Sequence, residues 1–196
     1  VLEGIRQFHT AGEKELTKAL LEEHLAGMSR NSEALALLAQ IYSDENDLDK
    51  AIALAREAWN RRVQGSSRSQ NYYYSYYGGY YMTGGIGGVT SPDQLLQQLH
   101  QYLAAANRSA ELIAEFEESL AKQPGSIELH RNLATLYQLS NDTDKAIGVW
   151  EQLIEKRPNY AEAKLTRAQM LVQKGRFDEA LAAYEDMLAK TPSLYR

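Results

Sequence analysis

Residues 127–160 read IELHRNLATLYQLSNDTDKAIGVWEQLIEKRPNY. Apolar side chains recur every three to four positions, first over 129–137 and again over 146–154. That spacing places them on one face of a helix in each segment. The stretch therefore predicts two amphipathic helices.

A polar turn, 140–143, separates the two helical patterns. Asp142 or Thr143 can cap the second helix, because a side-chain oxygen there accepts a hydrogen bond from an otherwise unpaired backbone N–H. Pro158 then closes the unit, since proline is not tolerated inside a helix.

The same unit recurs along the chain with a period of 34 residues, which marks an internal repeat. Three classes of residue keep this spacing: the closing prolines, an aromatic residue eight positions before each proline, and a large residue earlier in the unit. They are Pro124, Pro158 and Pro192; Phe116, Trp150 and Tyr184; and Leu103, Tyr137 and Leu171.

This pattern resembles the tetratricopeptide repeat family, whose 34-residue unit reads Trp-x2-Leu-Gly-x2-Tyr, then Ala-x3-Phe, then Pro. Residues 127–160 match six of these positions, and only His130 departs where Trp or Leu is usual. The matching residues are Leu133, Ala134, Tyr137, Ala146, Trp150 and Pro158. The resemblance implies an all-α, right-handed solenoid of stacked helix-turn-helix repeats with no catalytic role.

The resemblance extends over most of the chain. Residues 161–194 form a second matching repeat, with Lys164 and Arg167 off the pattern, and 32–65 a third. Residues 93–126 form a more degenerate repeat, and 1–31 read as a partial helix pair. Small residues should let the two helices of a unit approach closely. These are Ala39, Ala134 and Ala168, facing Ala51, Ala146 and Ala180.

An insertion of different composition, 66–92, interrupts the 34-residue period. Seven of the chain's 13 tyrosines lie in 72–81. Two interpretations stay open: a tyrosine-rich β-hairpin turning at Gly78-Gly79, or a flexible low-complexity loop. Its aromatic side chains could form a binding platform or occupy the groove of the repeats as an internal ligand. The platform residues are Tyr72, Tyr74, Tyr76, Tyr77, Tyr80 and Tyr81.

Composition excludes several classes of function. The chain has no cysteine, so disulfides and thiolate chemistry are absent. A net charge of -5 argues against a nucleic-acid-binding surface, and no segment is apolar enough to span a membrane. The four histidines are scattered, so neither a metal site nor a cofactor is expected. No catalytic constellation is found, and the compartment does not follow from the sequence.

The resemblance implies a groove lined by the first helix of each repeat, which commonly holds a peptide or a partner helix. Its expected lining is polar and rich in glutamine, and side-chain amides can both donate to and accept from a peptide backbone. The alternative is that these are ordinary solvated positions. The candidate binding residues are Gln40, Gln97, Gln101, Glu128, Arg131, Thr135, Gln138, Glu162 and Gln169.

The sequence thus predicts a non-enzymatic scaffold that binds another protein, as one segment of a longer chain. The carboxylate-gripping clamp of some family members is not expected, because only Arg131 and Asn132 approach its pattern. Two alternatives remain. One is a homo-oligomer, assembled through the tyrosine-rich insertion and an uncapped C-terminal face. The other is the regulatory arm of an enzyme whose catalytic domain lies outside this segment.

Overall fold

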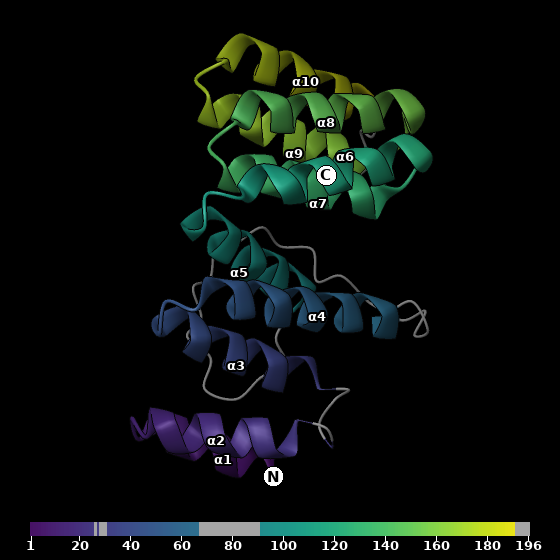
Figure 1. Ribbon diagram of the computed structural model, residues 1–196. Helices are drawn as coiled ribbons and strands as arrows, with labels where there is room; N and C mark the ends of the chain where they lie inside the picture. Colours follow the sequence, from purple (N-terminus) through teal and green to yellow (C-terminus); the bar gives the residue numbers. More distant parts are fainter. Residues whose placement is uncertain (26, 28–30, 67–90, 191–196) are drawn as a thin grey trace. The chain divides into compact units, whose positions relative to one another are not determined.

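A computed structural model describes residues 1–25, 27, 31–66 and 91–190, and over these residues every regular element is an α-helix (Figure 1). The all-α repeat fold is therefore confirmed for the described part of the chain. The helices are α1 (Leu2–Thr10), α2 (Lys14–His24), α3 (Ser32–Asp44), α4 (Leu48–Ser66), α5 (Pro92–Ala105), α6 (Ser109–Lys122), α7 (Ile127–Leu139), α8 (Thr143–Lys156), α9 (Ala161–Gln173) and α10 (Phe177–Lys190).

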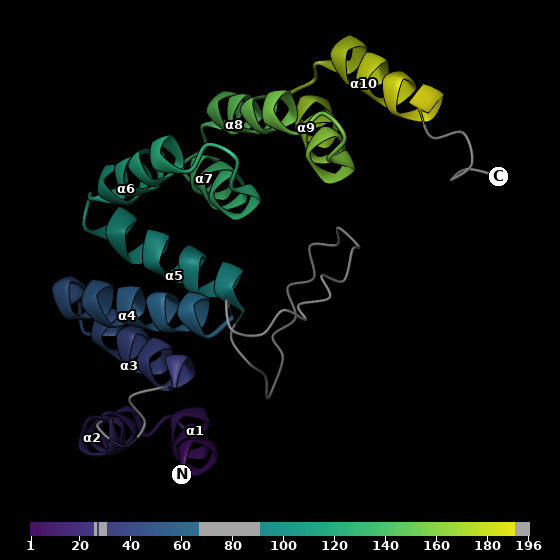
Figure 2. The same cartoon turned by 90° about the vertical axis from the view of Figure 1, so that its right-hand side faces the viewer.

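The chain divides into two compact units, 1–107 and 108–196. Within each unit every helix packs against the next one along the chain, from α1 to α5 in the first unit and from α6 to α10 in the second. The helix pairs of the first unit can be followed in Figure 2. A predominance of contacts between sequence neighbours is typical of repeat proteins, whose stability is roughly a sum over units and their interfaces.

Small residues lie at the contact between the two helices of a pair, as the sequence predicts. The six alanines expected there are Ala39, Ala51, Ala134, Ala146, Ala168 and Ala180, and none is more than 2% exposed. Larger side chains fill the remaining space, among them Leu38 and Ile41 in the first unit and Trp150 and Leu153 in the second. Each such side chain contributes about 1.5–3 kcal/mol by leaving water.

The turn inside each helix pair is built on one residue with a positive φ. These residues are Gly12, Asn46, Asn107, Asn141 and Gly175, with φ between 57° and 86°. Only glycine and, to a lesser degree, asparagine adopt this left-handed conformation readily. At Asn141 the amide bonds to the Gln138 carbonyl and the next amide bonds back to Tyr137, which is a Schellman C-cap.

Side chains cap the amino ends of several helices. Asp142 accepts a hydrogen bond from the Lys145 amide, which confirms one of the two caps considered for α8. Asn31 caps α3, and Ser126 caps α7. A full capping box begins α5, where Ser91 and the Gln94 side chain bond to each other's backbone N–H.

Parts of the sequence interpretation remain predictions. The hairpin or loop at 66–92 falls almost wholly outside the described residues, apart from Ser66 at the end of α4 and Ser91 and Pro92 at the start of α5. The division into repeats at the residue boundaries given above also stays a prediction. None of the described helices combines the length and the apolar character that crossing a membrane requires.

Candidate functional site

The first unit carries a groove of about 1150 Å³ on its odd-numbered helices, α1, α3 and α5. Its walls come from residues one helical turn apart on each helix, because positions i, i+3, i+4 and i+7 share a face. The lining residues are Glu3, Arg6, Gln7, His9, Thr10 and Ala11 on α1 and the residue that follows it; Glu33, Ala36, Leu37, Gln40, Ser43 and Asp44 on α3; and Gln94, Gln97, Gln98, Gln101 and Tyr102 on α5.

Gln98 ties the α5 wall to the α3 wall. Its side-chain amide donates to the Ala36 carbonyl at 3.2 Å and to the Tyr102 hydroxyl at 2.8 Å. Both Ala36 and Tyr102 are buried, so these bonds form the floor of the groove. Burial raises the pKa of Tyr102, and the negative charge of Asp44 adds to that rise. The negative charge of Asp44, which lies on α3, therefore affects a side chain of the α5 wall.

An ion pair joins α1 to α3 near the amino end of α3. The Arg6 guanidinium donates to the Glu33 carboxylate at 2.6 Å and also pairs with Glu3 at 3.6 Å. The Arg6 and Glu33 side chains are 30% and 17% exposed, so this pair is only partly screened by water. The Arg6 guanidinium of the groove lining is thus shared between two carboxylates.

The other end of the groove lies at the carboxyl ends of the same helices. Asp44, the last residue of α3, pairs with Lys14 at 2.5 Å, and the Asp44 side chain is 40% exposed. Lys14 begins α2, so this pair brings the start of α2 to the end of α3. Gly12, in the turn between α1 and α2, separates Lys14 from the end of α1. These bonds and the Arg6 pair show that α1 and α3 run parallel along the groove.

Three of the candidate binding residues meet in this groove. Gln40, Gln97 and Gln101 line it, and all three side chains are exposed. Gln94 also lines it, but its side-chain oxygen accepts from the Ser91 amide and belongs to the capping box of α5. Gln98, which the repeat register did not select, is the amide that holds the floor together.

Sequence reasoning missed the α1 wall, because the repeat register was applied only from residue 32 onward. A signal was available: Glu3, Arg6 or Gln7, and Thr10 are polar residues at helical spacing on the predicted first helix. His9 lies on the same wall, and its ring Nδ1 is buried with no hydrogen-bond partner among the described residues. Unpaired buried nitrogens of this kind are uncommon in folded proteins.

The remaining candidates lie on α7 and α9 of the second unit. Arg131 and Glu162 contact each other as an ion pair at 3.8 Å, and the Tyr160 hydroxyl also donates to Glu162. Burial and this carboxylate raise the pKa of Tyr160. The other four are not part of this ion pair. Glu128 and Gln138 are exposed on α7, Thr135 is half-buried there, and Gln169 is exposed on α9. Asn132, of the clamp pattern, is buried.

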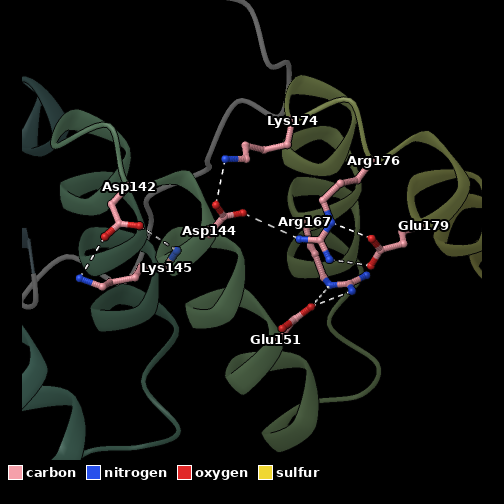
Figure 3. Close-up of polar contacts among 8 residues, drawn as sticks. All are labelled: Asp142, Asp144, Lys145, Glu151, Arg167, Lys174, Arg176 and Glu179. Atoms are coloured by element: carbon pink, nitrogen blue, oxygen red, sulfur yellow. Dashed lines mark hydrogen bonds and ion pairs between the residues drawn. The ribbon is translucent and has the colours of Figure 1, made fainter.

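A network of charges links α8 to α9 and α10 (Figure 3). The Asp144 carboxylate accepts from Lys174 at 2.9 Å and lies 3.9 Å from Arg176. Arg176 makes two bonds to Glu179, at 2.6 and 2.7 Å. Nearby, the off-pattern Arg167 binds Glu151 with two nitrogens, at 2.8 and 2.7 Å. The other off-pattern residue, Lys164, lies 3.6 Å from Asp186.

Three ring-bearing side chains, those of Tyr137, Trp150 and His130, are buried in the second unit. The Tyr137 hydroxyl donates to Glu117 and joins α7 to α6. Burial and that carboxylate raise the pKa of Tyr137 to about 12. Trp150 on α8 is 4% exposed, and no acceptor among the described residues lies within hydrogen-bonding distance of its indole Nε1. His130 is 1% exposed, and its Nδ1 lies 2.7 Å from the Ser126 carbonyl oxygen.

The six platform tyrosines, from Tyr72 to Tyr81, lie outside the described residues. Within the part of the chain that the structure describes, no three His, Asp or Glu side chains gather into a group that could hold a metal ion.

These helix pairs with their left-handed turns define an α-helical repeat protein. Two segments match family models described as tetratricopeptide repeat, residues 32–59 and residues 131–194. The chain therefore carries tetratricopeptide repeats in these two segments. A comparison with curated protein sequences gives no match.

Solved structures of several repeat proteins are similar over most of their length. A putative kinesin light chain with nearly identical TPR-like repeats, from Podospora anserina, is 15% identical, with 99% of this chain and 94% of that chain covered and a TM-score of 0.48. MamA from Desulfovibrio magneticus RS-1 is 12% identical, with coverage of 99% and 94% and a TM-score of 0.43. YrrB, described as a TPR protein with an unusual peptide-binding site, is 13% identical, with coverage of 96% and 84% and a TM-score of 0.41.

Proposed function

We propose that this protein is a non-catalytic scaffold whose first unit binds an extended peptide in the groove of α1, α3 and α5. The observation that carries the proposal is the row of exposed glutamines on the groove walls. Gln40, Gln97 and Gln101 leave both a donor and an acceptor facing the groove, and a peptide backbone offers the matching groups at every residue.

The groove also has the dimensions of a peptide site. An extended chain that follows the groove along α3, a helix of 13 residues and about 20 Å, needs about six residues. Because the Gln98 and Arg6 bonds hold the walls together, the groove is preformed, and binding would order the peptide more than the protein. The tetratricopeptide repeats in the same chain support the scaffold role.

The test is selection of a displayed library of random peptides of about ten residues on the full chain, followed by affinity measurement of the selected peptides. Gln97→Arg places a long side chain in the groove and should weaken binding at least tenfold. Gln152→Arg makes the same change at an exposed position of α8 in the second unit and should leave binding unchanged. Equal affinity of both variants would refute the groove as the binding site.

A further inference from the structure

The groove described above is not electrically neutral. Its described lining contains three carboxylates, those of Glu3, Glu33 and Asp44, against the single guanidinium of Arg6. Arg6 is already paired with both Glu3 and Glu33 at one end. Since the described lining residues offer no second guanidinium or ammonium group, an acidic ligand would meet repulsion along the whole groove.

Each end of the lining carries one net negative charge, but Asp44 is the carboxylate that has no cation of the described lining beside it. Asp44 is the last residue of α3, so its carboxylate adds to the negative end of that helix's dipole. The dipole of parallel α1 points in the same direction, although the Gln7, Phe8 and His9 carbonyls accept hydrogen bonds from amides of the following turn. The field of Asp44 also reaches Tyr102 on the opposite wall. Ser43 and Gln101 supply neutral hydrogen-bonding groups beside it.

Lys14, the ion-pair partner of Asp44, does not block access to Asp44 from the groove. Lys14 belongs to α2, and it is not part of the groove lining. The Lys14 and Asp44 side chains are 56% and 40% exposed, and ion pairs of that exposure stabilise a protein only weakly. A second cation that enters from the groove can share or replace Lys14 at little cost.

We infer that the groove selects an extended segment that is uncharged along most of its length and carries a lysine or arginine side chain at the Asp44 end. This inference rests on the proposed function of the groove. The glutamines hold the backbone of the segment, whereas Asp44 determines which side chain is accepted. The chemistry is opposite to that of a site that grips a terminal carboxylate.

The experiment uses the peptides selected on the full chain. Basic residues should be enriched at one position. Replacing the enriched Lys or Arg with Gln should weaken binding about three- to fivefold on the wild-type protein, the range that an exposed charge pair supplies. On the Asp44→Asn variant the same replacement should change affinity less than about 1.5-fold, because the carboxylate that attracts the basic side chain has been removed.

The matched control is Glu23→Gln, which removes the same charge from an exposed position of α2 that does not line the groove. It should keep the full preference for the basic peptide. Peptides that lose binding with Gln97→Arg, yet show no basic enrichment or an equal loss on Asp44→Asn, would overturn this inference and leave the proposed function standing. If no selected peptide depends on Gln97, both fall together.

Discussion

At Trp150, two opposing contributions to the free energy of unfolding can be measured separately: the burial of the indole ring and the cost of its unpaired N–H. Its indole is buried, and the ring N–H has no acceptor among the described residues. Leaving a donor unpaired in the core costs about 1–3 kcal/mol. The phenyl ring of Phe116 occupies the same position one period earlier, buried to 5% exposure.

We expect Trp150→Phe to be nearly neutral. Losing part of the indole ring costs about 1–2 kcal/mol in burial and cavity formation, while removing the unpaired N–H returns a similar amount. The free energy of unfolding should therefore change by no more than about 1 kcal/mol. Trp150→Ala, which removes the whole ring, should cost about 3–5 kcal/mol.

The assay is guanidinium unfolding followed by circular dichroism on the full chain, with benzothienylalanine at position 150 as the decisive variant. That residue keeps both rings and replaces the N–H with sulfur, so it removes the unpaired donor without leaving a cavity. It should stabilise the protein by about 1–3 kcal/mol. A loss of stability in this variant would refute the reasoning, because it would mean that the N–H has a partner in the folded protein.

Two further predictions concern Tyr137 and Asn141. Because the pKa of Tyr137 is raised to about 12 in the folded protein, the tyrosine contributes stability below pH 10 that is lost as the pH rises towards 12; Tyr137→Phe should flatten this fall in pH-dependent unfolding, and an unchanged profile would contradict the assignment. At Asn141, where φ is 61°, Ala should destabilise the second unit by roughly 1 kcal/mol and Gly should be neutral or slightly stabilising, as measured by thermal unfolding; equal stability of the Ala and Gly variants would contradict the left-handed turn.

The helices were predictable because two independent periods agree in the sequence. Apolar residues at helical spacing locate the helices, and the 34-residue spacing of Pro124, Pro158 and Pro192 aligns the units. The turn residues carry the same information: Asn107, Asn141 and Gly175 are also 34 residues apart. Local preference and repeat pattern point to one structure, which is the condition for a reliable prediction.

The candidate site was predictable only in part. The repeat register selected Gln40, Gln97 and Gln101, which line one groove in the structure, and their role in binding stays a prediction. It could not show that Gln94 is engaged in a helix cap or that Gln98 binds across to α3. Both results depend on competition between partners, and only the folded arrangement decides which bond each amide makes.

The ion pairs at the ends of the first helices also have a consequence for the order of the repeats. Lys14 starts α2 and pairs with Asp44 at the end of α3, whereas Asp144, near the start of α8, pairs with Lys174 just after α9. Both ion pairs join the start of the second helix of one pair to the end of the first helix of the next pair, but the acidic and basic partners are exchanged. If the α9–α10 pair were grafted behind α2, Lys174 would face Lys14, and the junction would meet like charge. These two helix pairs are therefore not interchangeable, because the first helix of each ends in the charge that suits the helix it follows.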